Sequence, residues 1–230
     1  MRLILFDIDG TLVDCSGQTR RPFADALLEV YGETGDIDRY EFSGKTDPRI
    51  VFDLLTGAGR GADEVLERVP AVHDRYVEKL DASLDAARVR VLPGVRELLD
   101  ALVARTDVAV GLLTGNWRRG AAIKLSRPGL DGYFAFGAFG DGALDRDELP
   151  PVARRRALER LGRDFAPEAT LVVGDSPLDV ACARAHGIPC LAVATGWTTA
   201  AALAAAGADR VVADLTEIDP ERLADPAMGL

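Results

Sequence analysis

The stretch Leu3-Ile4-Leu5-Phe6-Asp7-Ile8-Asp9-Gly10-Thr11 decides the fold of this chain. Four apolar residues run directly into Asp7, and a second carboxylate follows at Asp9. An unbroken apolar run of this kind predicts a strand that is buried on both faces, as in a parallel sheet covered by helices. Gly10 then permits a tight turn. We therefore expect both carboxylates at the carboxyl end of a buried strand, where open α/β sheets bind their ligands.

Two further predicted strands, 108–113 and 170–173, also end in polar residues. The first ends in Thr114-Gly115-Asn116, and the second in Gly174-Asp175-Ser176 with Asp179 close behind. Taken singly, each group is compatible with a helix N-cap or a solvated helix face. Because parallel strands end at the same edge of a sheet, the three groups together predict one site. So many carboxylates are costly to bury without a positive partner, which favours a bound divalent cation.

The pattern of elements predicts an α/β fold, a doubly wound parallel (Rossmann-like) sheet with an inserted α-helical cap domain. Strands and helices alternate from residue 89 onwards, which is typical of such a sheet. Between residues 16 and 88 the apolar spacing is helical throughout, with helices expected near 20–31, 48–55 and 62–82, the last as one or two helices. We therefore predict a catalytic core formed by 1–15 and 89–230, and a cap formed by 16–88.

Composition narrows the classes of function. The chain has 230 residues and a net charge of −10, which argues against nonspecific binding to nucleic acid or to an anionic membrane. No apolar run approaches the roughly 20 residues of a membrane span, and no signal peptide is recognised. The three cysteines show no metal-ligand spacing and are expected to be reduced. These features predict a cytoplasmic protein, a monomer or a homodimer, that acts on a small molecule.

Asp7-x-Asp9-Gly10-Thr11 after an apolar strand resembles the first motif of the haloacid dehalogenase superfamily, in its phosphatase branch. Thr114 in Leu-Leu-Thr-Gly-Asn resembles the second motif, and Gly174-Asp175-Ser176-x-x-Asp179 the fourth. The helical insertion resembles the cap of phosphoglycolate phosphatase-like members, as do Gly44-Lys45-Thr46-Asp47 within it and Leu92-Pro93-Gly94 at its exit. The resemblance covers nearly the whole chain.

The resemblance implies a Mg²⁺-dependent phosphatase for a small phosphorylated metabolite, with phosphoglycolate as the family-level guess. Asp7 would be the nucleophile that forms an aspartyl-phosphate, and Asp9 the general acid and base. The metal would be held by Asp7, the backbone carbonyl of Asp9 and Asp175, with Asp179 supporting its water shell. The expected contacts to the phosphoryl group come from the loops after the first two strands: Gly10, Thr11, Thr114, Gly115 and Asn116. Lys45 and Arg49 are either cap-side anion contacts or ordinary surface charges.

One motif departs from the family pattern. The third motif usually places a lysine near the start of the helix that precedes the fourth motif, but Glu148 occupies that position here. Lys124, which is the only lysine between the second and fourth motifs, lies in the wrong helix. An arginine must replace the missing cation, or the site lacks it. Arg146 and Arg156 are the two candidates for a catalytic cation beside the nucleophile, and Arg154 and Arg155 are expected to be solvated.

Other functions remain open at this point. A sugar-phosphate mutase on the same scaffold would also retain Asp9, and a noncatalytic phosphate-binding or interaction module would show no turnover. A haloacid dehalogenase is disfavoured, because its chemistry needs neither an acid at position 9 nor a metal.

Overall fold

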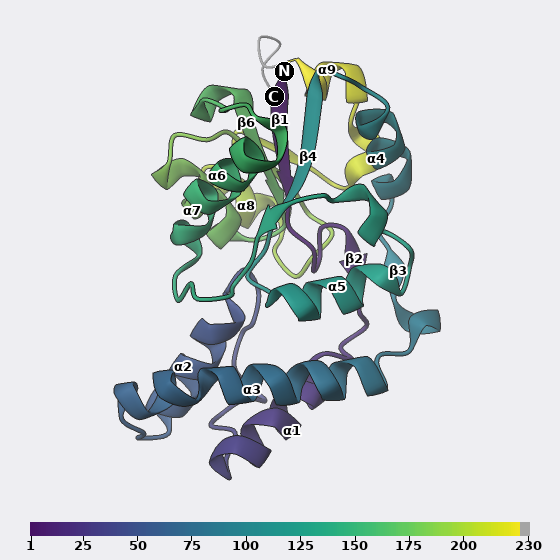
Figure 1. The fold of residues 1–230 in the computed structure, drawn as a ribbon. Helices are drawn as coiled ribbons and strands as arrows, with labels where there is room; N and C mark the ends of the chain where they lie inside the picture. Colours follow the sequence, from purple (N-terminus) through teal and green to yellow (C-terminus); the bar gives the residue numbers. More distant parts are fainter. Residues whose placement is uncertain (226–230) are drawn as a thin grey trace.

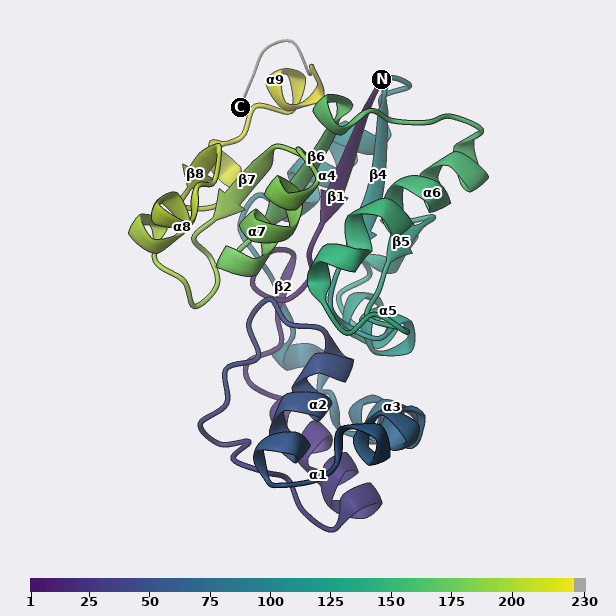
Figure 2. The same ribbon diagram turned by 90° about the vertical axis from the view of Figure 1, so that its left-hand side faces the viewer.

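A six-stranded parallel sheet lies at the centre of the computed structural model, which describes residues 1–225. Strand β1 is central, with β4 on one side and β6 on the other, in the order β5-β4-β1-β6-β7-β8 (Figures 1 and 2). The strands of this sheet are β1 (Arg2–Phe6), β4 (Val108–Leu113), β5 (Gly137–Ala138), β6 (Thr170–Gly174), β7 (Cys190–Val193) and β8 (Arg210–Val212). The chain therefore changes direction across the sheet next to β1, which is where ligand sites form in such folds.

The apolar run of β1 is buried on both faces, as predicted. Ile4 and Phe6 belong to the apolar cluster that contains side chains of the helix at residues 95–103, while Leu3 and Leu5 belong to the cluster formed with the helices at residues 149–161 and 177–185. Because successive side chains of a strand point to opposite faces, one uninterrupted run serves both layers. The helices that accompany this sheet are α4 (Val95–Val103), α5 (Arg118–Ser126), α6 (Leu149–Leu161), α7 (Pro177–Ala185), α8 (Ala200–Ala206) and α9 (Pro220–Ala224).

Three helices between β1 and β4 form a separate layer, called here the helical segment. They are α1 (Arg20–Tyr31), α2 (Asp47–Gly57) and α3 (Ala62–Ser83). Figures 1 and 2 show this layer beyond the carboxyl ends of the sheet strands. The chain enters and leaves it through two short strands that pair antiparallel, β2 (Val13–Asp14) and β3 (Arg90–Val91). The helices fall inside the predicted cap, whose boundaries at 16 and 88 remain predictions.

The structure differs from the sequence prediction in small elements. The segment 62–82 forms the single helix α3 although Pro70 lies inside it. Proline removes one backbone donor, but buried side chains on both sides of it, Val65 and Val72 among them, keep the helix packed against its neighbours. The edge strand β5 was not predicted, because Gly137 and Ala138 have little preference for strands. The last part of the predicted core, 226–230, lies outside the described residues.

Within residues 1–225, no helix combines the length and the apolar character that crossing a bilayer requires. The three cysteines are buried and unpaired, as predicted: Cys15, Cys182 and Cys190.

Candidate active site

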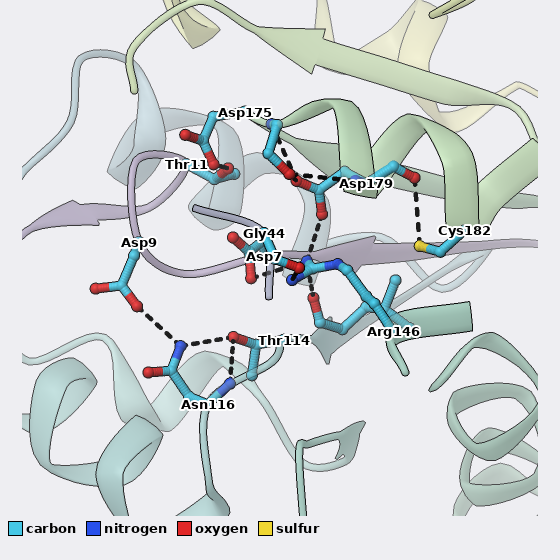
Figure 3. A network of polar contacts seen from close by, with 12 residues as sticks. Asp7, Asp9, Thr11, Gly44, Thr114, Asn116, Arg146, Asp175, Asp179 and Cys182 are labelled. Atoms are coloured by element: carbon cyan, nitrogen blue, oxygen red, sulfur yellow. Dashed lines mark hydrogen bonds and ion pairs between the residues drawn. The ribbon is translucent and has the colours of Figure 1, made fainter. Parts of the chain in front are cut away.

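Three carboxylates gather where two neighbouring strands end. Asp7 follows β1, Asp175 follows β6, and Asp179 lies in the first turn of α7. These residues are buried, and one oxygen of each carboxylate lies within 4.8 Å of the other two (Figure 3). The backbone N–H of Asp7 donates to the carbonyl of Val173 at 2.9 Å, which continues the pairing of β1 with β6 past the end of the strand. Parallel pairing therefore brings together residues that are far apart in the sequence.

Local turns hold these carboxylates in place. Ser176 caps α7: its hydroxyl accepts a hydrogen bond from the backbone N–H of Asp179 at 3.2 Å, and its own N–H donates to Asp179 Oδ2 at 3.0 Å. This reciprocal pair is a capping box. Gly10 has a φ of 81°, and a Cβ there would collide with the carboxylate of Asp175. The turn after the first strand thus requires glycine both for its conformation and for its close approach to Asp175.

The carboxylate cluster holds more negative charge than its surroundings offset. Burial is the largest cause that raises the pKa of Asp7, to about 6, although the guanidinium of Arg146 opposes the rise. Burial also raises the pKa of Asp175 to about 9, with further contributions from the charges of Asp179 and Asp7. Mg²⁺ prefers hard oxygen ligands such as carboxylates and would offset this charge. The donor set therefore fits Mg²⁺, with Asp7 and Asp175 as the candidate side-chain ligands.

Arg146 lies beside the predicted nucleophile. Its side chain is 4% exposed, and its Nη2 lies 3.1 Å from Asp7 Oδ1 and forms a second ion pair with Asp179. Its Nη1 donates to the backbone carbonyl of Gly44, in the helical segment's loop, at 3.0 Å. Burial acts to lower the pKa of Arg146, but the two carboxylates outweigh it and hold the pKa well above its ordinary value. A fixed cation therefore stands at the site that lacks the usual lysine.

The second arginine candidate lies elsewhere. Arg156 donates to the backbone carbonyl of Gly137 at 2.6 Å, and its guanidinium lies 5.9 Å from the centre of the Phe139 ring. Glu148, at the position of the usual lysine, accepts a hydrogen bond from the backbone N–H of Asp145 at 2.9 Å and so caps the 3-10 turn that carries Arg146. Of the two predicted alternatives, the structure brings Arg146 to Asp7.

Asp9 has two partners, one of which the sequence analysis missed. Asn116 Nδ2 donates to Asp9 Oδ2 at 2.8 Å, and Lys124 Nζ lies 2.6 Å from the same oxygen. Lys124 also donates to Asn116 Oδ1 at 2.6 Å. Burial disfavours the charged form of Lys124, but Asp9 and other acidic neighbours hold its pKa well above the ordinary value. The lysine set aside as lying in the wrong helix therefore belongs to the site, through Asp9 rather than Asp7.

A signal for Lys124 exists in the sequence. Ala121, Lys124 and Leu125 are spaced as one face of a helix, and the structure buries all three in α5. A lysine on an apolar helical face needs a buried partner, because lysine is almost never fully buried unpaired. The spacing of the third motif points to the helix before the fourth motif, and so does not include this face of α5.

The residues predicted to hold a phosphoryl group line the ends of β4 and β1. Thr114 is fully buried, and its Oγ1 accepts a hydrogen bond from Asn116 Nδ2 at 2.7 Å. Thr11 Oγ1 donates to Asp175 Oδ1 at 3.4 Å. The side-chain amide of Asn116 is thus engaged with Thr114 and with Asp9. Gly10 and Gly115 complete the two loops that carry these residues.

The loop 44–47 of the helical segment, called here the docking loop, packs against the loop after β4. The backbone N–H of Asp47 donates to the carbonyl of Gly115 at 2.8 Å, and Asp47 Oδ2 accepts from the backbone N–H of Trp117, also at 2.8 Å. Thr46 Oγ1 donates to the carbonyl of Leu144 at 2.7 Å. A Cβ at Gly115 would collide with the backbone carbonyl of Lys45. The helical segment therefore contacts the candidate site by its backbone.

The two cap-side cations have other partners. Lys45 Nζ donates to the carbonyl of Glu41 at 2.9 Å and lies 3.9 Å from the centre of the Tyr40 ring. Arg49 Nη1 lies 2.7 Å from Asp145 Oδ1. This ion pair joins the helical segment to the loop that carries Arg146. Both alternatives for Lys45, a cap-side anion contact and an ordinary surface charge, therefore stay predictions.

Comparison with known proteins places this chain in a family. Residues 1–187 match the haloacid dehalogenase-like hydrolase family. The chain is 29% identical to a phosphoglycolate phosphatase of Pseudomonas fluorescens over 95% of its length and 79% of that protein. It is 30% identical to a plasmid-encoded phosphoglycolate phosphatase of Cupriavidus necator over 97% of its length and 96% of that protein.

Solved structures agree on the architecture. A β-phosphoglucomutase of Clostridium difficile superimposes with a TM-score of 0.72, at 15% identity, over 98% of this chain and 96% of that one. Likeness at this identity establishes the fold alone.

Proposed function

This chain belongs to the haloacid dehalogenase-like hydrolase family, and on that premise we propose that it is a Mg²⁺-dependent phosphatase of small phosphomonoesters. The observation that carries the proposal is the buried cluster of Asp7, Asp175 and Asp179 with Arg146 beside Asp7. Phosphoglycolate is the proposed substrate class, because two relatives that the chain matches over nearly its whole length are named for it. The helical segment is proposed as the cap that closes over the site and selects the substrate.

Asp7 is the proposed nucleophile. One carboxylate oxygen attacks phosphorus, the bond from phosphorus to the leaving oxygen breaks, and an aspartyl-phosphate forms. Arg146 fixes the orientation of Asp7 through Oδ1 and offsets part of the negative charge. The charge of Arg146 opposes the rise that burial causes in the pKa of Asp7, and so favours the ionised form that a nucleophile requires.

Asp9 is the proposed acid and base. It gives its proton to the leaving oxygen and then takes a proton from the water that attacks the aspartyl-phosphate, which releases phosphate and restores Asp7. Its side chain is 42% exposed, so a substrate can reach it. Thr11, Thr114 and the backbone N–H groups of the two loops are proposed to hold the phosphoryl oxygens.

Mg²⁺ is proposed to bind Asp7, Asp175 and the backbone carbonyl of Asp9. When bound, it would neutralise charge on the carboxylates and on the substrate phosphate. Asp179 is proposed to support the site, since its carboxylate already accepts from Ser176 and pairs with Arg146.

The test is phosphate release from a panel of phosphomonoesters, with Mg²⁺ and with EDTA. We expect Mg²⁺-dependent turnover that EDTA abolishes, and a folded Asp7→Asn variant without activity. Substantial residual turnover by that variant would exclude Asp7 as nucleophile, and activity indifferent to EDTA would exclude the metal.

The same assay separates the alternatives. A mutase would interconvert two positional isomers of a sugar phosphate and require a bisphosphate, instead of releasing phosphate. A noncatalytic module would turn over nothing on the panel. A dehalogenase would release halide from 2-haloacids and keep that activity in Asp9→Ala, whereas a phosphatase is expected to lose about 10²–10⁴-fold in that variant.

A further inference from the structure

Lys124 holds a buried position that its charge makes costly. Its side chain is 5% exposed, whereas the side chain of its ion-pair partner Asp9 is 42% exposed. Moving an ammonium group out of water costs several kcal/mol unless close partners compensate it. A residue with a purely structural role on this face of α5 would be apolar, as the neighbouring Leu125 is. The lysine therefore points to a requirement of the group that it touches.

The contacts of Lys124 restrict one oxygen of Asp9 and leave the other available. Lys124 Nζ and Asn116 Nδ2 both contact Asp9 Oδ2, at 2.6 and 2.8 Å. Lys124 also donates to Asn116 Oδ1 at 2.6 Å, so the three side chains form a closed triangle. Figure 3 shows the Asn116 side of this triangle, with the amide pointing to the carboxylate of Asp9. Within residues 1–225, neither donor nor any other recorded partner contacts Asp9 Oδ1.

This arrangement suits a carboxyl group that must deliver a proton in one direction. A general acid acts through one oxygen, which has to reach the leaving group at hydrogen-bond distance. Two donors on Oδ2 occupy that oxygen and restrict the orientation of the carboxyl group. Within residues 1–225 no protein donor contacts Oδ1, so this is the oxygen that is left to meet the leaving group.

We propose that Lys124 is a positioning residue which, with Asn116, holds Asp9 Oδ2 so that Oδ1 carries the proton to the leaving oxygen. The inference rests on the proposed function, in which Asp9 is the general acid. It adds a residue outside the recognised motifs and assigns the two oxygens of Asp9 different tasks.

The proposal predicts a dependence on the leaving group. An alcohol leaving from an alkyl phosphate such as 2-phosphoglycolate needs a proton, whereas 4-nitrophenolate leaves readily without one. Loss of Lys124 should therefore slow the first substrate much more than the second. The parameter to compare is kcat/KM, because it reports the steps up to departure of the leaving group and not the later hydrolysis of the aspartyl-phosphate.

The experiment uses Lys124→Met and Lys124→Gln, with Lys79→Met as the matched control. Lys79 forms an ion pair of 2.8 Å with Glu29 inside the helical segment, away from Asp9. For both Lys124 variants we expect kcat/KM to fall by about 10–100-fold on 2-phosphoglycolate and less than about threefold on 4-nitrophenyl phosphate. The ratio of the two values is independent of how much of a preparation is folded. Lys79→Met should leave the ratio at the wild-type value.

A second readout asks whether Lys124 acts through Asp9. In an Asp9→Ala background, Lys124→Met should cause no further loss on the alkyl phosphate, since the acid is already absent. Equal losses on both substrates, or full additivity with Asp9→Ala, would overturn the positioning role while the wild type remains an active phosphatase. A wild type inactive on the whole panel would instead overturn the proposed function, and this inference with it.

Discussion

At the scale of single residues, the guanidinium of Arg146 joins three parts of the molecule. It pairs with Asp7 after β1 and Asp179 in α7, and it donates to the carbonyl of Gly44 in the docking loop. A planar fork with several donors can satisfy these partners at once, whereas the ammonium of lysine is a compact point charge. The arginine that we propose in place of the usual lysine therefore also contacts the helical segment.

We expect Arg146→Ala to lower kcat by about 100-fold or more, since it removes the only recorded cation on Asp7 within residues 1–225. It should also lower the melting temperature, because it leaves two buried carboxylates without their partner. Arg156→Ala is the control and should keep kcat within about twofold, because Arg156 contacts a carbonyl and an aromatic ring away from Asp7. Kinetics and thermal melts of both variants check this. Equal effects of the two substitutions would contradict it.

The residues of the site were predictable to different degrees. Asp7, Asp175 and Thr114 each follow a recognisable apolar strand, and parallel pairing brings the ends of such strands together. The apolar runs in the sequence were therefore enough to predict that these residues lie close to one another. The choice between Arg146 and Arg156 depended on the path of a loop, which no periodicity describes. Lys124 depended on how α5 returns against the end of β1, a tertiary contact that the spacing of motifs does not contain.

At the scale of elements, the docking loop and the loop after β4 meet backbone to backbone. Asp47 bonds the carbonyl of Gly115, and Gly115 leaves room for the carbonyl of Lys45. This contact requires the absence of a side chain at position 115. It makes the position of the helical segment over the site sensitive to a single methyl group.

Gly115→Ala should therefore displace the docking loop and lower kcat/KM by about 10–100-fold, because displacements near 1 Å in an active site have costs of this order. Gly120→Ala is the matched control: a Cβ there would meet the Tyr76 ring at an ordinary 3.5 Å, in the first turn of α5. It should raise the free energy of unfolding by at most about 0.5–1 kcal/mol through helix propensity, with activity retained. Steady-state kinetics and denaturant melts test the pair, and an active Gly115→Ala enzyme would disprove the steric requirement.

Long elements were predicted well and short ones poorly. The helix predicted over 20–31 is α1 (Arg20–Tyr31), because its apolar residues recur with helical spacing. The strand predicted over 108–113 is β4 (Val108–Leu113), because its apolar run is unbroken. The two-residue strands β2 and β3 pair through the backbone, which leaves almost no pattern in the side chains. The single helix α3 shows tertiary packing overriding the local effect of Pro70.

At the scale of the whole molecule, the buried carboxyl groups make the free energy of unfolding depend on pH and on Mg²⁺ binding. The pKa values of Asp7, Asp47 and Asp175 are raised by burial from 3.8 to about 6, 7 and 9. The folded state thus binds protons more tightly than the unfolded state. The stability gained by protonation is fully present at low pH and is lost as pH rises through the folded pKa values.

In EDTA, the melting temperature should accordingly fall between pH 6 and pH 9. Mg²⁺ at about 100 times its Kd should stabilise the protein by about 2.7 kcal/mol. For a chain of this size that corresponds to a rise of roughly 5–10 °C in the melting temperature. Asp175→Asn should flatten the metal-free profile above pH 7 and lose most of the Mg²⁺ response. A metal-free melting temperature that rises with pH, or an unchanged Mg²⁺ shift in Asp175→Asn, would refute the assignment of Asp175.

The antiparallel pairing of β2 and β3 has a consequence for the order of folding. Strands β1 and β4 must pair although Ile4 and its partner Val110 are roughly 100 residues apart, which imposes a large loop-closure entropy. If α1–α3 assemble first and draw Asp14 to Arg90, the loop still to be closed shrinks to roughly 30 residues, a gain of about 1 kcal/mol. The inserted helices would then hold the two flanking segments of the chain together. They would shorten the loop that must close before the first parallel pair of the central sheet forms.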